Sequence, residues 1–266
     1  MSCSQDNPAL TIPFKWNLPA RANVLHAAAV QHNEKRDTVV VFAHGAGANM
    51  DSPFMLAMAE GLAASGITVV RFNFLYMQAN AEDGKRRPPD RAPKLLAHFS
   101  AVLEQVCEQV ISKAQLHKSS PLPPRIILMG KSMGGRMAAT LAGMALTPHE
   151  VNVPAGLTSV AIGPASSHIS AVVCLGYPFV PLKGGEPRLE PLQTCPVPVC
   201  IVQGERDKFG GLAQVPDWPL PREIVFHWIA DGCHSFIPRK SSGTTENANL
   251  AKAVEAVVEF IGGLDA

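Results

Sequence analysis

Ser132 has the setting of an activated nucleophile. It is flanked two residues away on each side by glycine, in the stretch Gly130-Lys131-Ser132-Met133-Gly134. An apolar run precedes this stretch at 125–129 and a helix-like run follows it. A serine between a strand and a helix, with glycines at these two positions, sits on a sharp strained turn that exposes its hydroxyl. The pattern therefore predicts a serine nucleophile.

The same residues also contain Gly-Lys-Ser, which ends a phosphate-binding loop. Such a loop requires another glycine five residues before Gly130, so that successive backbone N–H groups wrap the phosphates. Arg125 occupies that position, and the residues between form a strand-like run. The spacing excludes the nucleotide-binding interpretation.

A serine hydrolase of this kind also needs an acid and then a histidine, in that order along the chain. Glu205 and Asp207 follow the strand-like run 197–204. We predict Asp207 as the acid because the spacing between the strand and this residue matches the usual acid loop of such hydrolases. Glu205 is the alternative. The competing interpretation is that Asp207 is a solvated loop charge beside Arg206 and Lys208.

His234 is the predicted base. It follows the last strand-like run, 223–229, and precedes the last helix-like run. Asp231 is a second alternative for the acid, but it lies only three residues from His234 on the same loop. Cys233 lacks a strained turn of its own, so we interpret it as a packed thiol.

The oxyanion of the reaction requires two backbone N–H donors. We predict Met133, directly after the nucleophile, and Ala46, in the glycine-rich segment 43–55. His44 is interpreted as a structural histidine bonded to nearby backbone. Arg71, Asn73, Tyr76 and Arg136 are secondary candidates that either line a pocket or serve the fold.

These residues predict one mechanism. His234 takes the proton of Ser132, whose oxygen attacks an acyl carbon, while Asp207 orients the imidazole. Water then hydrolyses the acyl-enzyme. The expected substrate is a small acyl compound, and neither a metal nor an organic cofactor is required.

The elements that must position these residues alternate along the chain. Near-continuous apolar strands separated by helices predict a mostly parallel sheet covered on both faces. We expect one α/β domain over 1–266, without a large cap domain. The segment 78–93 is predicted to be a surface loop, and 147–170 a small insertion over the site. Strands are predicted at 37–45, 67–74, 125–130, 171–179, 197–204 and 223–229, and helices at 53–66, 93–116 and 136–146, with a last helix stopped by Gly262 and Gly263.

Composition limits the partners. The net charge is +1 with no basic run, which argues against nucleic acid or an anionic membrane as the main partner. The sequence has no apolar run long enough for a membrane helix and no export signal, so a cytoplasmic protein is expected. The six cysteines lack CxxC spacing and are interpreted as reduced thiols. The oligomeric state does not follow from the sequence.

Seven stretches carry a family resemblance and occur in one order from about residue 37 to the last helix: FAHGAGANMDSPFM, RFNFLYM, RPPD, GKSMGGRMA, LGYPF, VQGERDKFG and DGCHSF. The chain resembles the α/β-hydrolase branch that groups bacterial α/β-hydrolases with Tex30 and KANSL3-like proteins, near the dienelactone hydrolases. This resemblance implies an α/β-hydrolase fold with Ser132, Asp207 and His234 at the triad positions.

The resemblance does not imply a substrate. Dienelactone hydrolases carry a cysteine at the position of Ser132, so their lactone substrate is not transferred to this chain. One eukaryotic relative is a subunit of a chromatin-modifying complex. A non-catalytic binding or complex-assembly protein is therefore the alternative function.

Overall fold

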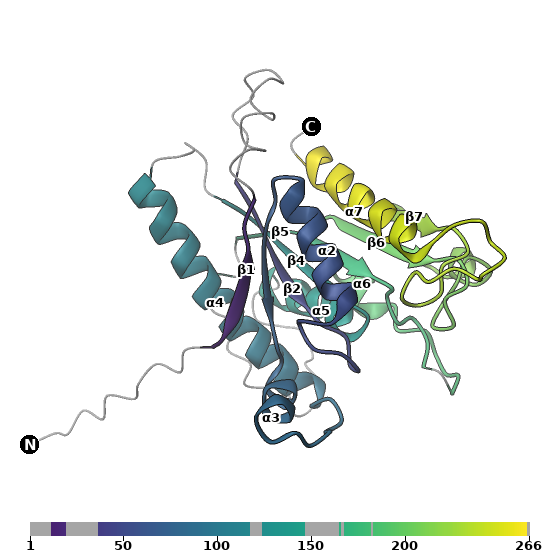
Figure 1. The fold of residues 1–266 in the computed structure, drawn as a ribbon, viewed down its shortest axis with the longest axis horizontal. Coiled ribbons are helices and arrows are strands. Elements are labelled where there is room, and N and C mark those ends of the chain that lie inside the picture. The colour runs from purple at the N-terminus through teal and green to yellow at the C-terminus, as the bar shows by residue number, and fades with distance from the viewer. Residues whose placement is uncertain are drawn as a thin grey trace, which may run out of the picture.

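The computed structural model describes residues 12–19, 37–117, 124–146, 165, 168–181 and 183–264. Within them lies a seven-stranded sheet of order β1-β3-β2-β4-β5-β6-β7 (Figure 1). All neighbouring pairs are parallel except β1 and β3. The strands are β1 Phe14–Asn17, β2 Thr38–Ala43, β3 Thr68–Phe72, β4 Arg125–Lys131, β5 Ile169–Leu175, β6 Val199–Gly204 and β7 Val225–Ile229. The predicted mostly parallel sheet is confirmed.

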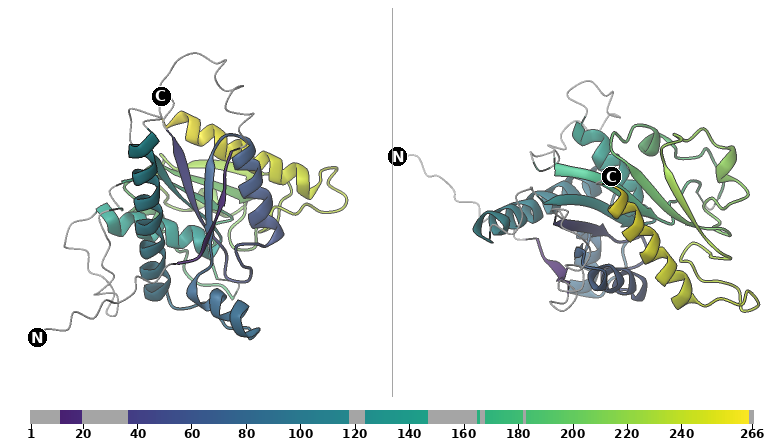
Figure 2. Two further views of the ribbon diagram at one scale, coloured as in Figure 1. Left: turned by 60° about the vertical axis from the view of Figure 1, so that its left-hand side comes forward. Right: turned by 90° about the horizontal axis from the view of Figure 1, so that it is seen from above.

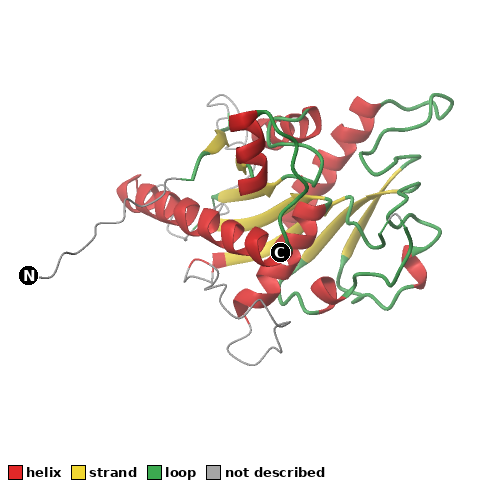
Figure 3. Cartoon of the chain, turned by 90° about the horizontal axis from the view of Figure 1, so that it is seen from below, coloured by secondary structure: helices red, strands yellow, loops and turns green. Residues whose placement is uncertain are grey.

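Burial on both faces explains why the central strands are continuous apolar runs. All residues of β4 and β6 are buried, as expected for parallel strands between two layers of helices. One core cluster lies between the sheet and the helices α4 Ala92–His117 and α5 Met133–Leu146. The other lies against α2 Pro53–Ala64 and α7 Glu246–Gly263, on the opposite face (Figures 2 and 3).

Three expectations need correction. The strand β1, a short antiparallel edge strand, was not predicted, and its alternating pattern spans only four residues. The predicted loop 78–93 is wrong in its first part, because α3 Leu75–Asp83 is helical and ends at Gly84, whose φ of 70° is left-handed. The last helix continues through Gly262 and Gly263, since glycine lowers helix stability without forbidding the helical conformation.

The other predicted helix and strand positions agree with the structure to within a few residues at their ends. The described residues of the segment 181–196 are irregular apart from the single turn α6 Glu190–Gln193. Residues 147–164 of the predicted insertion lie outside the described residues. In the described part of the chain, no helical cap domain interrupts the alternation of strands and helices, and no helix is long and apolar enough to cross a membrane.

The parallel arrangement decides where the candidate residues meet. Strands β2 to β7 all point in one direction, so their following loops emerge at one edge of the sheet. In open α/β sheets this carboxyl edge is where ligands bind. The loops after β2, β4, β6 and β7 carry the residues singled out from the sequence.

Candidate active site

Ser132 occupies a strained turn between β4 and α5. Its φ of 52° is positive, a conformation that non-glycine residues rarely adopt. The flanking glycines are sterically required. A Cβ atom on Gly130 would lie 2.0 Å from the Gly134 carbonyl carbon, and one on Gly134 would lie 2.4 Å from the Ala43 carbonyl oxygen. The predicted sharp turn at 130–134 is therefore present.

The structure brings the three predicted triad residues together. The Nε2 atom of His234 lies 2.8 Å from the Oγ of Ser132. The Nδ1 atom of the same ring lies 2.8 Å from the Oδ2 of Asp207. These residues are 27 and 102 positions apart from His234 in sequence, so only the tertiary structure joins them.

Asp207 is buried rather than solvated. Its Oδ1 accepts a hydrogen bond of 2.8 Å from the backbone N–H of Phe209. Its Oδ2 accepts one of 3.0 Å from the side-chain amide of Gln203. Two donors other than His234 thus orient the carboxylate.

Gln203, which the sequence analysis did not single out, organises the acid loop. It is fully buried at the end of β6. Its amide group donates to the Gly210 carbonyl at 2.8 Å, and its amide oxygen accepts from the Tyr177 N–H at 2.8 Å. The signal in the sequence was a polar residue closing an otherwise apolar strand.

The surroundings of His234 favour its neutral form. Burial lowers its pKa, while the hydrogen bond to Asp207 acts in the opposite direction. The Phe209 ring packs against the imidazole with a centroid separation of 4.4 Å. With Nδ1–H donating to the carboxylate, the Nε2 lone pair faces the hydroxyl of Ser132. A neutral imidazole in this tautomer can accept the serine proton.

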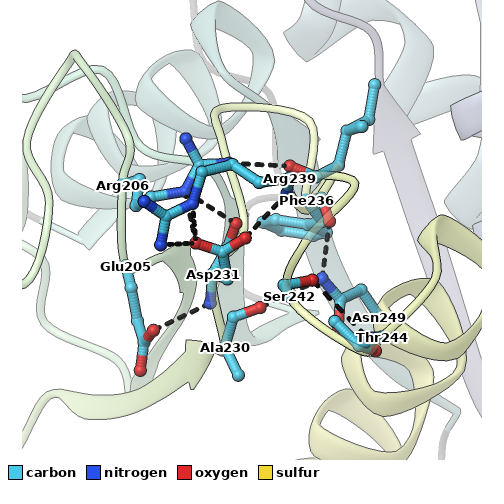
Figure 4. Close-up of polar contacts among 10 residues, drawn as sticks. Glu205, Arg206, Ala230, Asp231, Phe236, Arg239, Ser242, Thr244 and Asn249 are labelled. Carbon is cyan, nitrogen blue, oxygen red and sulfur yellow. Dashed lines mark hydrogen bonds and ion pairs between the residues drawn. The ribbon is translucent and has the colours of Figure 1, made fainter.

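Both alternative acids belong to a network that braces the loop after β7 (Figure 4). The Asp231 carboxylate pairs with Arg206 at 2.7 Å and with Arg239 at 2.6 Å. The Asp231 N–H donates to the Glu205 carboxylate at 2.8 Å. Hydrogen bonds from the side chain and backbone of Arg239 lower the pKa of Asp231. In this structure it is Asp207, rather than either alternative, that contacts His234.

Asn249 ties the same loop to α7. It is fully buried, and its side-chain amide donates to the Phe236 carbonyl at 2.7 Å and the Ala230 carbonyl at 3.2 Å (Figure 4). These acceptors lie on either side of His234 in the chain. A polar residue on the first turn of an apolar helix was the only trace of this role in the sequence.

His44 ties the segment after β2 to Phe74, the residue before α3. Its Nε2 accepts a 3.0 Å hydrogen bond from the Phe74 N–H, so the proton is on Nδ1, which donates to the Gly45 carbonyl at 2.7 Å. Burial lowers the pKa of His44 to about 4. The predicted structural role of His44 is confirmed.

The two predicted oxyanion donors belong to segments close to Ser132. Met133 begins α5 directly after Ser132. Ala46 follows Gly45, where an added Cβ atom would lie 3.5 Å from the Ser132 Cβ atom. The Tyr76 hydroxyl donates to the Ala46 carbonyl at 3.1 Å.

The remaining secondary candidates divide into two groups. Arg71 donates to Asn17 at 2.9 Å, to Asp51 at 3.0 Å and to the Met50 carbonyl. Asn73 accepts from the Met50 N–H at 2.8 Å, so both residues hold the segment after β2. Arg136 is half-buried on α5, where burial lowers its pKa.

Among the described residues, no group of three or more His, Cys, Asp and Glu side chains is placed to hold a metal ion. The five cysteines of the described ranges carry free thiols, and Cys107, Cys174 and Cys200 are buried.

The family model described as an alpha/beta hydrolase domain matches residues 36–262. The chain belongs to the α/β-hydrolase family. The α/β-hydrolase fold expected from the sequence is confirmed. No curated protein is significantly similar to the chain in sequence.

Several solved structures share the fold. Est1E from Butyrivibrio proteoclasticus with bound ferulic acid has a TM-score of 0.58 and 16% identity, with 95% of each chain covered. A dienelactone hydrolase from Anabaena variabilis has a TM-score of 0.57 and 16% identity, with 86% of this chain and 87% of that chain covered. An alpha-beta serine hydrolase homologue from Coxiella burnetii has a TM-score of 0.56 and 17% identity, covering 93% and 90%.

Proposed function

We propose that the protein is a serine hydrolase that cleaves an ester, thioester or related acyl bond of a small molecule. The observation that carries this proposal is the continuous hydrogen-bond path from the hydroxyl of Ser132 through His234 to Asp207, with both contacts at 2.8 Å. Nucleophile, base and orienting acid within hydrogen-bond distance are the signature of covalent acyl transfer.

In the proposed reaction His234 accepts the proton of Ser132 through Nε2 as the serine oxygen attacks the acyl carbon. The backbone N–H groups of Ala46 and Met133 stabilise the resulting oxyanion, aided by the positive end of the α5 dipole. The imidazolium then protonates the leaving group, and Asp207 stabilises its charge. His234 next activates water, which releases the acid and restores Ser132.

The related proteins support this class of reaction. One structural neighbour, Est1E, has ferulic acid bound, and another is an alpha-beta serine hydrolase homologue. We also propose that the chain belongs to the Tex30 and KANSL3-like branch, on the basis of the seven stretches quoted above, and that its location is cytoplasmic. The proposed reaction uses no cofactor.

The proposal is tested with a fluorophosphonate probe and a panel of acyl esters and thioesters. Wild-type protein is expected to react with the probe and to hydrolyse at least one substrate class. Ser132→Ala is expected to lose both properties, because it removes the hydroxyl that lies 2.8 Å from the Nε2 atom of the base. Ser65→Ala, at the exposed end of α2, is the matched control and is expected to behave as wild type.

Equal labelling of wild type and Ser132→Ala would contradict the proposal. A folded wild-type protein that neither reacts with the probe nor hydrolyses any ester, yet copurifies with a stable partner, would support the non-catalytic alternative. In that case the triad geometry would be a retained feature of a binding or assembly protein.

A further inference from the structure

The proposed mechanism gives no role to the side chain of Lys131. This side chain lies beside His234, the proposed base. Lys131 is the last residue of β4 and is buried. Its Nζ donates a hydrogen bond of 2.5 Å to the backbone carbonyl of His234. The residue before the nucleophile is thus connected to the residue that deprotonates the nucleophile.

A neighbouring glycine leaves room for this contact. A Cβ atom on Gly176 would lie 2.8 Å from the Nζ of Lys131 and 2.8 Å from the carbonyl oxygen of His234. Gly176 also has a φ of 63°, which disfavours other residues. The backbone after β5 is therefore shaped so that the ammonium reaches the carbonyl.

Aromatic rings take the place of water around this cation. The Nζ lies 5.2 Å from the ring centroid of Phe54, on α2, and 6.0 Å from that of Phe236, on the loop after β7. The two rings are 5.4 Å apart. Ring faces attract a cation at these distances, so the ammonium is stabilised by the rings and the carbonyl.

A purely structural role does not account for a charge at this place. Burial of an ammonium is costly unless it is compensated, and a methionine would fill the space beside two phenylalanines without that cost. The fold retains a cation next to the imidazole instead. What an apolar side chain would lack is the hydrogen bond to His234 and the positive charge.

The charge acts on the imidazole. Asp207 and Cys233 are the titratable groups that face the ammonium, and Asp207 and Lys131 are those that act on His234. Burial lowers the pKa of Lys131 to about 8, so it remains protonated at neutral pH. Burial first, and then the charge of Lys131, lowers the pKa of His234 against the opposing effect of Asp207.

We propose that Lys131 is a positioning residue for the base: its ammonium holds the backbone of His234 in place, and its charge keeps the imidazole unprotonated until Ser132 transfers its proton. The carboxylate alone would favour the imidazolium, which cannot accept that proton. Lys131 offsets this effect in the resting protein. The inference deepens the proposed function and rests on it.

The decisive experiment titrates the His234 ring by NMR in wild type, Lys131→Met and Lys131→Gln. The pKa of His234 is expected to rise in both variants, because both remove the charge. This measurement needs no turnover. It therefore decides on Lys131 even if the wild-type protein hydrolyses none of the substrates tested, a result that would count against the proposed function alone.

The kinetic experiment separates the charge from the hydrogen bond. In both variants the acid limb of the kcat/KM profile is expected to move to higher pH. Lys131→Met is also expected to lose about 10- to 100-fold in kcat/KM at its optimum, the effect of one hydrogen bond to a charged group. Lys131→Gln retains a donor and is expected to lose less.

Lys252→Met, which removes an exposed lysine from α7, is the matched control and is expected to leave both profiles unchanged. Thermal unfolding identifies any variant that fails to fold, and Lys131→Gln then replaces Lys131→Met as the test. A pKa of His234 that stays constant or falls in the folded variants would overturn the inference.

Discussion

His44 is expected to make the fold sensitive to mild acid. Burial holds its pKa at about 4, against 6.5 for an unperturbed histidine. Between these values the unfolded chain binds more protons than the folded protein, so stability falls as the pH falls. The stabilisation is fully present above about pH 6.5 and is lost as the pH approaches 4. At about 1.4 kcal/mol for each pKa unit, the total is about 3 kcal/mol.

The geometry explains why His44 resists protonation. In the neutral ring Nε2 accepts from the Phe74 N–H and Nδ1 donates to the Gly45 carbonyl. A proton on Nε2 would remove the acceptor and set two N–H groups against each other. A buried backbone donor would then be left unsatisfied, which costs about 1–3 kcal/mol, and the segment carrying Ala46 would lose its attachment.

The assay is urea unfolding of wild type and His44→Gln at about pH 7 and about pH 5. Wild type is expected to lose about 2 kcal/mol more than the variant between these conditions, since the glutamine does not titrate. Contributions from other groups cancel in the difference. Equal losses in the two proteins, with equal urea dependence, would refute the reasoning.

Three further predictions concern the site and its supports. Asp207→Asn is expected to lower kcat about 10⁴-fold by favouring the wrong imidazole tautomer. Asp231→Asn is expected to retain far more ester hydrolysis. Equal losses in the two variants would contradict the assignment of Asp207 as the acid. Gly134→Ala is expected to destabilise the fold by several kcal/mol in thermal unfolding, because its Cβ atom would lie 2.4 Å from a backbone oxygen of β2, while Gly47→Ala has open space and is expected to change little. Asn249→Ala is expected to lower both the melting temperature and kcat, since it removes the two hydrogen bonds on either side of His234. An unchanged kcat would show that the loop holds its position without these two hydrogen bonds.

The order of the strands and helices could be predicted because the spacing of apolar residues within each element is a local pattern. Parallel strands buried on both faces must be apolar throughout, and the helices between them carry apolar residues at helical spacing. The strand β1 was missed since an edge strand of four residues has little pattern to read. The last turns of α3, residues 78–83, were predicted as loop because the polar residues there resemble those of a surface segment.

The candidate site was partly predictable for a similar reason. Gly130, Ser132 and Gly134 lie within five consecutive residues, so their pattern can be recognised without knowledge of the tertiary structure. The acid and the base followed from their order after particular strands. The supporting residues Gln203 and Asn249 have no such signal, because a buried amide is recognised only by the carbonyl and carboxylate groups that surround it.

Local sequence patterns are enough to predict the class of fold, the strained turn at Ser132 and the loops that carry an acid and a histidine. Tertiary structure decided which acid meets the histidine: Asp207 is buried against His234, and Asp231 is turned toward Arg206 and Arg239. It also decided the place of Lys131. The physical reason is that hydrogen bonds and charges act over a few ångströms between groups about a hundred residues apart, and only the packed sheet sets those distances.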